Sequence, residues 1–538
     1  MNLTFRRNYP ILLLVITALG LLVFVLGEQR VIAYTTQIAS TENEDVSFGY
    51  NYANRSDLFD DSMVHTIQVI MDEDEYNNML TTFQETGLKE YFKVDIVIDG
   101  VRINEVGIRL KGNASLRSAF GGGGGGGMVQ PNFGQGGNLG ELPQRPEEGD
   151  VPEFGEKTQL PENFDQTGEI PEGLENHQFP PVMGEQGDLP EGFNFPEGDG
   201  FQRNNLSMLD SGEVKIPFMI KFDEYISAQT YQGHTAIALR TYGTSYDEAI
   251  LQEPLTNQVA NLVGLPATKT AYTGFIINGE DEKLYVVSEL VNEVFLDENF
   301  DNSDGILYKA ELGSTLNYKG EDPSSYADSF NQQTRKNEAD LLPLISFMRF
   351  LEQADDQTFE NELRNWLDVD SFALYLAVNA IVVNTDSMIG MNNNFYLYYD
   401  DLSEKFTVIM WDTNESFGKL GGLATYDISL SDVPSGFQGG RGGRGGAMGG
   451  EQNVLISRFL DNETFRTLYE EQLAFVYNQV FESNFLQETI SQYSSLIDSI
   501  NEERNFVDIY AYDQDVDNLL EFISQRRDFL AKQTILTN

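Results

Sequence analysis

The sequence lacks cysteine and has very few histidines, and both deficits restrict its chemistry. None of the 538 residues is cysteine, and the three histidines are His65, His177 and His234. The absence of cysteine excludes disulfide bonds, zinc–thiolate sites and thiol catalysis. Three scattered histidines argue against a multi-histidine metal centre and against a serine–histidine triad. Any catalysis must therefore rest on carboxylates, lysine or arginine, and bound cations.

Basic residues are also scarce. The chain has 34 Lys and Arg against 85 Asp and Glu, which gives a formal net charge of −51. This charge argues against binding of nucleic acid, or of an anionic membrane, through the body of the protein. Divalent cations and basic partners are the natural counterparts. The alternative is that the acidity serves solubility alone, since much of it lies in low-complexity sequence.

The N-terminus carries an apolar run. Arg6 and Arg7 precede an uncharged stretch over residues 8–27, and residues 11–26 of it are apolar. That length fits a membrane span and also fits a signal peptide. Because no A-x-A cleavage pattern follows directly, we favour a retained anchor. The positive flank predicts that the rest of the chain lies outside the cytoplasm.

The segment over residues 384–418 predicts a β-hairpin flanked by two acids. Asp386 lies in a polar loop before the first expected strand (395–399), and Asp412 directly follows the second (406–411). Because antiparallel strands fold back on themselves, both acids should return to one edge, where they form a candidate metal and phosphoryl site. The alternative for the Asp386 loop is an ordinary Asn/Asp turn. An ordinary turn explains Asp412 less well. It follows a buried apolar strand, where a carboxylate needs a cation or hydrogen-bond donors as partners.

The same segment resembles the CotH family, whose members have an atypical protein-kinase-like fold. The family has an N-x-D loop, an Asn before an aromatic strand, and a strand ending in W-D-x-D-x-[TS]-[FW]-G. The matching residues are Asn384-Thr385-Asp386, then Asn394-Phe395-Tyr396-Leu397-Tyr398, then Trp411-Asp412-Thr413-Asn414-Glu415-Ser416-Phe417-Gly418. Their order and spacing agree with the family pattern.

The resemblance implies an α+β, two-lobed fold with a β-rich N-terminal lobe and an α-rich C-terminal lobe. It implies ATP as the nucleotide, with Mg²⁺ or Mn²⁺ held by Asp412 and assisted by Asn394 and Asn414. Asp386 would accept the proton of a Ser or Thr hydroxyl. Asn414 departs from the family pattern, because it keeps an oxygen ligand but loses the charge of the second acid.

Two further motifs bear on the nucleotide. Residues 112–115, Gly-Asn-Ala-Ser, resemble the family's phosphate-covering loop, so Asn113 and Ser115 are expected nucleotide contacts; the alternative is a plain turn. Lys215 matches the lysine of the family's K-x-[PS]-[FY] strand and is our candidate for the lysine that pairs with phosphate. Lys221 competes with it, and both could instead be solvated strand residues.

A helix is expected over residues 247–262, with Asp247 as its N-cap. By the resemblance, Glu253 in this helix would pair with Lys215, as the helix glutamate of kinases does. A surface position for Glu253 is the alternative, and Pro254 is expected to distort the helix. A hairpin about Asn278-Gly279 then leads to residues 288–292, which the comparison makes the adenine-contacting hinge.

Low-complexity tracts interrupt these motifs. A tract of seven glycines, Gly121 to Gly127, opens a Pro-Glu-rich stretch with the loose repeat LPENF, IPEGL, LPEGF, FPEGD, which we interpret as a disordered insertion. Its Phe residues could alternatively make it a docking segment. The expected organisation is a signal anchor or signal peptide (1–30), a linker (31–62), an N-terminal kinase-like lobe (63–300) containing the disordered insertion (118–210), and a C-terminal α-rich lobe (301–538) containing a Gly-rich loop (434–452).

Three functions follow from these observations. The first is an extracytoplasmic, membrane-anchored or secreted protein kinase that phosphorylates Ser or Thr of surface or spore coat proteins. Its partners would be a nucleotide, a protein substrate and, through the N-terminal segment, the cytoplasmic membrane, with no nucleic acid. The second is an acidic cation-binding or adhesion module, and the third is a non-catalytic scaffold with the kinase-like fold.

Overall fold

The computed structural model describes residues 50–112, 116, 215–243, 246–338, 340–420, 425–430 and 453–537. The expected anchor, the linker up to residue 49, the Gly- and Pro-Glu-rich insertion, and the Gly-rich loop at 434–452 lie outside these residues. No helix in the described ranges is both long enough and apolar enough to span a bilayer.

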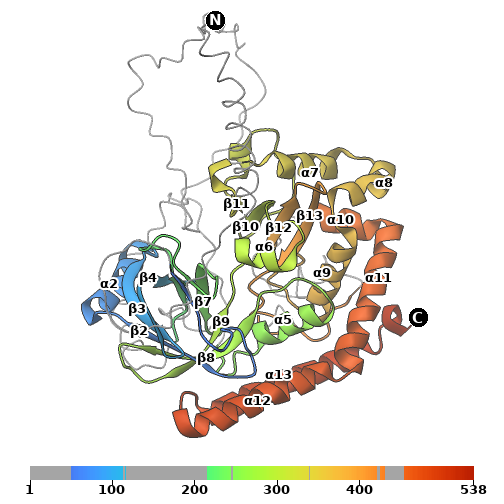
Figure 1. Ribbon diagram of the computed structural model, residues 1–538. Coiled ribbons are helices and arrows are strands. Elements are labelled where there is room, and N and C mark those ends of the chain that lie inside the picture. Colours follow the sequence, from blue (N-terminus) through green and yellow to red (C-terminus); the bar gives the residue numbers. More distant parts are fainter. Residues whose placement is uncertain are drawn as a thin grey trace, which may run out of the picture. The chain divides into compact units, whose positions relative to one another are not determined.

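The N-terminal half of the described chain forms a closed β-barrel (Figure 1). Neighbouring strands are antiparallel except β2 and β8, whose parallel pairing closes the barrel. In barrel order the strands are β2 (His65–Ile70), β3 (Phe92–Ile98), β4 (Val101–Leu110), β5 (Phe218–Lys221), β7 (Ala236–Arg240), β9 (Lys283–Ser288) and β8 (Thr270–Ile277). The sequence predicted a β-rich lobe here but not its closure.

Two hairpin turns of the barrel follow directly from the sequence. Asp99 and Gly100 join β3 to β4, and Asn278 and Gly279 form the tight turn that opens the connection 278–282 from β8 to β9; all four have positive φ. Two-residue turns of this kind match the right-handed twist of paired strands, and Asn-Gly and Asp-Gly tolerate the left-handed backbone they need. The hairpin expected about Asn278-Gly279 is confirmed.

Helix α5 (Gln252–Leu262) follows β7 and corrects the expected helix start. Asp247 is not its N-cap, because its Oδ1 accepts from the amides of Ala249 (2.8 Å) and Ile250 (3.1 Å) in a turn before the helix. Pro254 therefore lies in the first turn, where a missing N–H costs nothing, and the expected distortion does not arise. Helix α2 (Glu73–Thr86) is capped by Asp72, as Asp side chains favour.

An antiparallel four-stranded sheet carries the predicted central hairpin. Its order is β11 (Phe330–Gln332), β10 (Ile306–Ala310), β12 (Phe395–Asp400) and β13 (Lys405–Met410). The pairing of Phe395 with Met410 sets the register at the end from which Asn394 and Trp411 extend. The two strands expected from the sequence are thus confirmed to within one residue at each end.

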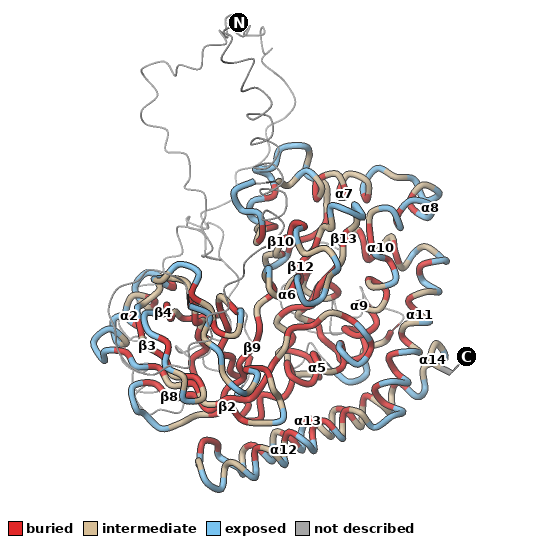
Figure 2. The backbone as a smooth tube through the Cα atoms, viewed as in Figure 1, coloured by how far each residue is buried: buried red, intermediate tan, exposed pale blue. Residues whose placement is uncertain are grey.

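Helices make up most of the remaining chain. The first three are α7 (Leu342–Gln353), α8 (Asp356–Trp366) and α9 (Val369–Ile381), and α9 is buried on nearly every side (Figure 2). Such burial explains why its sequence is apolar all round. The C-terminal helices are α10 (Val454–Asp461), α11 (Glu463–Tyr477), α12 (Phe485–Arg504), α13 (Ile509–Leu530) and α14 (Thr534–Thr537).

The barrel and the helical part each have an apolar core of their own. Alternate residues of the strands fill the barrel, among them Leu110, Phe218 and Leu239 on neighbouring strands. α9 and the C-terminal helices share a second core. A smaller cluster includes Tyr396 and Trp411 on the β12–β13 hairpin and supports the end where the predicted acids lie.

Candidate active site

The hairpin β12–β13 brings the two predicted acids to one edge. Asp386 lies in the loop after α9, and Asp412 lies two residues after β13. Asn394, which precedes β12, joins them: its Nδ2 donates to Oδ2 of Asp386 (2.9 Å) and to the main-chain oxygen of Asp412 (3.4 Å). The sequence argument from antiparallel geometry therefore placed the two acids at one edge correctly.

Asp386 is a partly buried carboxylate that titrates close to neutral pH. Burial raises its pKa to about 6, and the nearby charge of Asp412 contributes in the same direction. The amide groups of Asn393 (2.8 Å) and Asn394 each donate to one of its oxygens and limit the rise. A carboxylate with a pKa in this range can accept a proton from a hydroxyl at physiological pH.

Asp412 adopts a left-handed backbone, with φ 54°, in which its carboxylate is paired with the guanidinium of Arg240. Its side chain keeps 25% exposure, so one face remains accessible. Burial alone would raise the pKa of Asp412, but the charges of Arg240 and Lys111 outweigh it and hold the pKa below the usual range. Backbone strain of this kind at a non-glycine residue is typical of functional sites.

Arg240, the last residue of β7, also contacts α5. Its Nε lies 3.2 Å from Oε2 of Glu253, and the hydroxyl of Ser288 donates to Oε1 of the same carboxylate (3.1 Å). Burial opposes the charge on Arg240, but Asp412 and Glu253 together keep its pKa above the usual value. One guanidinium thus lies between two carboxylates, one from the barrel-side helix and one from the hairpin.

Lys111 is the second cation of the site. It follows the last residue of β4, and its amide donates to the carbonyl of Pro217 (3.0 Å). Since Leu110 and Leu239 point into the barrel in one row, the next residues, Lys111 and Arg240, extend from the outer face. Both cations lie over the ring of Trp411, at 5.1 and 4.6 Å. Burial, followed by the charge of Arg240, lowers the pKa of Lys111 to about 7.

The predicted pairing of Lys215 with Glu253 is wrong. Lys215 forms a buried ion pair with Glu248, which lies in the turn before α5, and Glu253 pairs with Arg240. The groups that act most on Lys215 are Glu248, Asp247 and Lys283, whereas Arg240, Lys111 and Lys309 act on Asp412. Lys215 therefore belongs to a different charge cluster from the two acids.

Sequence reasoning missed Lys111 and Arg240, although a signal existed for each. Lys111 directly precedes the Gly-Asn-Ala-Ser motif that was singled out for its loop residues. Arg240 ends the strand that leads to α5, which is where a cation has to lie to meet Glu253. Asn113 and Ser115 themselves lie outside the described residues, so their expected contact with nucleotide stays a prediction.

Asn414 and Glu415 lie against the main chain of Gly243. A Cβ atom at Gly243 would lie 2.2 Å from Oε1 of Glu415 and 3.2 Å from Nδ2 of Asn414. Any side chain at position 243 would therefore force the carboxylate of Glu415 to move. The loop that follows Asp412 is also bound to α5, because the hydroxyls of Ser416 and Thr256 lie 2.6 Å apart. The metal role of Asn414 stays a prediction.

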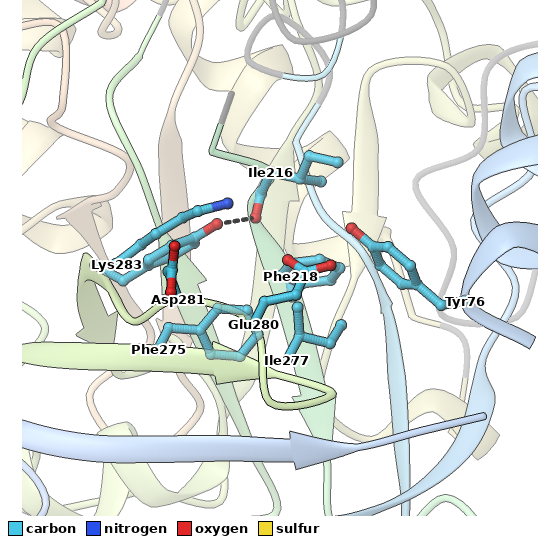
Figure 3. Close-up of a pocket in the computed structure, with 9 residues that line it drawn as sticks. Tyr76, Ile216, Phe218, Phe275, Ile277, Glu280, Asp281 and Lys283 are labelled. Carbon is cyan, nitrogen blue, oxygen red and sulfur yellow. Dashed lines mark hydrogen bonds between the residues drawn. The ribbon is translucent and has the colours of Figure 1, made fainter. Parts of the chain in front are cut away.

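A small cavity lies between β5, β8, β9 and α2 (Figure 3). Its volume is about 20 Å³, enough for a single water molecule. The hydroxyl of Tyr285 donates to the carbonyl of Ile216 (3.0 Å) at its edge, and Glu280 and Lys283 also line it. None of the residues described above for the acid site line this cavity, and it is too small for a nucleotide.

The donor set fits a cation shared with a bound phosphate. Within the described residues no group of three Asp, Glu or His side chains could hold a metal ion by itself. Mg²⁺ is ordinarily held by one or two carboxylates together with substrate phosphates. Nη2 of Arg240 is buried without a hydrogen-bond partner in the described structure, and it offers a donor to an anion. Asp412, Arg240 and Lys111 therefore fit a metal–nucleotide complex.

The sequence also matches a known family over much of its length. The match to the CotH kinase protein family spans residues 209–530. The chain belongs to this family. The resemblance based on the segment around Asp386 and Asp412 is thus confirmed at the level of the family, and the match covers the whole of the β12–β13 hairpin and α5.

The individual proteins that this CotH family member resembles share little sequence identity with it. The chain is 22% identical to the inner spore coat protein H of Bacillus subtilis (strain 168) over 318 residues, which are 57% of this chain and 80% of that protein. The Helicobacter pylori proinflammatory kinase CtkA matches 56% of this chain and 90% of its own, with TM-score 0.26 and 10% identity. A chain of the Shewanella oneidensis MR-1 toxin–antitoxin complex of HipA, HipB and operator DNA matches 55% of this chain and 60% of its own, with TM-score 0.22 and 11% identity. At this level neither structure assigns a function or a residue to this chain.

Proposed function

We propose that this CotH family protein is an ATP-dependent phosphotransferase that acts on Ser or Thr hydroxyls of other proteins outside the cytoplasm. The observation that carries the proposal is the convergence of two acids of unequal pKa with two cations. Asp386 titrates near pH 6, and Asp412 is held ionised by Arg240 and Lys111. Pairs of carboxylates whose environments separate their pKa values are typical of acid–base sites.

The nucleotide side of the site is formed by β7, α5 and the end of β4. In protein kinases a strand lysine pairs with a glutamate of the following helix and contacts the phosphates. Arg240 and Glu253 have this relationship here, because one ends β7 and the other lies in the first turn of α5. We assign the phosphate contact to Arg240 with Lys111, in place of Lys215. Guanidinium groups bind phosphate oxygens in two-point geometry, which suits Arg240 to this task.

The acceptor side is formed by Asp386 and Asp412. Asp412, with Asn394 and Asn414 nearby, would hold Mg²⁺ or Mn²⁺. When bound, the cation neutralises charge on the phosphates of ATP. Asp386 would hold the acceptor hydroxyl in line with the phosphate and accept its proton. Phosphoryl transfer depends mainly on positioning and charge neutralisation, so carboxylates, one or two cations and a divalent metal suffice.

The proposed location and partners rest on the relative and on the N-terminal sequence. The Bacillus subtilis relative is named as an inner spore coat protein. Together with Arg6 and Arg7 before the apolar run, this supports a place outside the cytoplasmic membrane, with the N-terminal segment as an anchor or signal peptide. The protein substrate would then be a surface or coat protein. The net charge of −51 argues against nucleic acid as a partner.

A non-catalytic kinase-like scaffold is the second candidate. Asn414 replaces the second acid of the family motif, which lowers the negative charge available to a cation. An acidic cation-binding module is less favoured, since the described part of the chain has no acid cluster that could hold a metal by itself.

Labelled ATP tests the proposal directly. The full-length protein is incubated with γ-labelled ATP and Mg²⁺ or Mn²⁺, and label is followed into protein and into free phosphate. Metal-dependent transfer that is lost in Asp412→Ala supports the phosphotransferase. Metal-dependent ATP binding without any transfer supports the scaffold instead. If the protein binds no nucleotide with either cation, both readings give way to the acidic surface module.

A further inference from the structure

Arg526 of α13 is a buried cation whose hydrogen bonds within the described chain all go to main-chain carbonyls. Its side chain is 1% exposed. The guanidinium donates to the carbonyls of Ala380 (2.8 Å), Ile381 (3.3 Å), Tyr426 (2.7 Å) and Ile428 (2.7 Å). Burial lowers its pKa to about 9. The charge of Asp427 opposes this shift but forms no ion pair with Arg526 in the described part of the chain. A buried guanidinium that is bonded to main-chain carbonyls alone is costly to a fold, so its bonds must provide something that an apolar side chain cannot.

Two of these carbonyls end the helix that leads to Asp386. The last carbonyls of any helix lack a partner within the helix, and a cation there also interacts favourably with the helix dipole. Immediately after α9 the chain turns through Val383, which has φ 54°. A β-branched residue rarely adopts this left-handed conformation, so surrounding contacts have to hold it. Arg526 supplies such contacts five and six residues before Asp386.

The other two carbonyls belong to residues 425–430, which follow Asp412 in the chain. The carbonyls of Tyr426 and Ile428 bind Arg526, and that of Leu430 accepts from the hydroxyl of Tyr469 on α11 (3.2 Å). Alternate carbonyls of this segment therefore face the C-terminal helices. Leu430 is buried, whereas Tyr426 keeps 40% exposure. The segment thus presents one side to α11 and α13 and the other outward.

We propose that Arg526 is a positioning residue that fixes residues 425–430 against the C-terminal end of α9, from which the Asp386 loop starts, and so aligns the acceptor polypeptide for phosphoryl transfer. This inference rests on the proposed phosphotransferase function. The carbonyls that Arg526 binds lie at the C-terminal end of α9 and on the segment that follows Asp412, and not on β4 or β7, which lead to Lys111 and Arg240. Loss of the four-way contact should therefore impair use of the acceptor while leaving nucleotide binding intact.

Arg526→Lys in the full-length protein is the test variant. Lysine keeps the charge, but its single ammonium group cannot reach four carbonyls in the planar geometry of a guanidinium. Arg504→Lys is the matched control, because Arg504 on α12 also donates to main-chain carbonyls, those of Val64 and His65, but on the barrel. Tyr469→Phe is a milder variant that releases only the carbonyl of Leu430 and nearly preserves volume.

Three measurements are made on each variant. They are the Kd for Mn²⁺–ATP, the KM and kcat for the best acceptor from a Ser/Thr peptide library, and hydrogen exchange of peptides covering 378–386 and 425–430. For Arg526→Lys we expect faster exchange in both peptides, a loss of about 10-fold or more in kcat/KM for the acceptor, and an ATP Kd within about 3-fold of the wild type. Tyr469→Phe should loosen residues 425–430 alone, with a smaller loss. Arg504→Lys should change neither peptide.

Several results would overturn the inference. One is Arg526→Lys with wild-type exchange and wild-type transfer. Another is a parallel loss of nucleotide binding, transfer and stability, which indicates a purely structural arginine. If Arg526→Lys does not fold, Tyr469→Phe with unchanged exchange at 425–430 and unchanged acceptor KM also overturns it. If the wild type transfers no phosphate, the proposed function is wrong, and so is the acceptor alignment inferred here. Faster exchange in the two peptides of Arg526→Lys would then show only that Arg526 holds these segments in place.

Discussion

Arg240 forms an ion pair with Asp412 while its Nε lies 3.2 Å from Glu253. The residue that we assign to the phosphates thus also neutralises the carboxylate that we assign to the metal. Burial raises the pKa of Glu253, and Arg240 opposes that rise, so removal of the guanidinium leaves Glu253 and Asp412 with Lys111 as the nearby cation that acts on both. A metal ion bound by Asp412, as we propose, would compete with Arg240 for this carboxylate unless a phosphate drew the guanidinium away.

Arg240→Met should therefore strengthen binding of Mn²⁺ in the absence of nucleotide and weaken binding of ATP. With the guanidinium gone, the carboxylates of Asp412 and Glu253 gain a divalent cation as their best available counter-charge. We expect Mn²⁺ affinity to rise, and ATP affinity to fall, by about 10-fold or more in each case. Electron paramagnetic resonance of free Mn²⁺ measures the first quantity, and calorimetry measures the second.

Arg240→Lys is the matched control, since it keeps the charge between the two carboxylates. Its Mn²⁺ affinity should stay near that of the wild type, with a smaller loss of ATP affinity because the two-point phosphate contact is gone. Equal Mn²⁺ affinity in the wild type and in Arg240→Met would contradict the competition described above.

The pH dependence of transfer should follow Asp386. A proton acceptor works only when ionised, so the rate should rise with pH through the pKa of about 6 and level off above it. Below that pKa the loss should be about 10-fold per pH unit. Asn393→Ala removes a donor to this carboxylate, so the pKa should rise further and the acid limb should shift toward higher pH. Profiles of kcat/KM for both proteins measure the shift. A limb near pH 4 in the wild type would assign the profile to an ordinary exposed carboxylate instead.

Local chain chemistry predicted the central hairpin well. The apolar strands β12 and β13 followed from residue type, as did the Asn278-Gly279 turn of the barrel. The edge-to-edge return of Asp386 and Asp412 followed from antiparallel geometry alone. This part of the site is local in sequence, since 26 positions separate the two acids and one hairpin connects them.

Contacts between distant strands could not be predicted in the same way. Barrel closure requires β2 to pair with β8, more than 200 positions later in the chain, and no local pattern encodes that pairing. Lys111 and Arg240 meet over Trp411 because β4 and β7 both pair with β5, which lies more than 100 positions after β4, so their place at the site was also missed. Lys215 was chosen by motif similarity, but the buried Glu248 lies nearer to it than Glu253 does.

Lys215→Met and Lys111→Met should separate the structural lysine from the lysine of the site. Lys215 and Glu248 are an almost fully buried pair, so removal of the lysine leaves a buried carboxylate unpaired and should lower the free energy of unfolding by about 3 kcal/mol. Lys111→Met should instead weaken ATP binding by about 10-fold with little loss of stability, because burial already lowers the pKa of Lys111 to about 7. Urea unfolding and ATP titration of both variants measure these effects.

The double variant Lys215→Met with Glu248→Gln should recover part of the stability. A larger loss of ATP affinity in Lys215→Met than in Lys111→Met would restore the original assignment.

Asp412→Ala and Asp386→Ala should fail at different steps. Asp412 is assigned to the cation, so Asp412→Ala should remove metal-dependent ATP binding together with transfer. Asp386 is assigned to the acceptor hydroxyl, so Asp386→Ala should bind Mn²⁺–ATP normally and lose transfer by about 100-fold or more.

Both variants, Asp412→Ala and Asp386→Ala, should fold. Loss of Asp386 should stabilise the protein near neutral pH. Burial raises the pKa of Asp386 in the folded state above its value in the unfolded state, so the folded state binds that proton more tightly. Ionisation of Asp386 above about pH 6 therefore costs stability. Thermal unfolding at pH 4 and pH 7.5 should therefore show a gain for Asp386→Ala, relative to the wild type, that is larger at the higher pH. If both variants keep transfer activity, neither carboxylate has the assigned role and the kinase-like scaffold becomes the better account of this site.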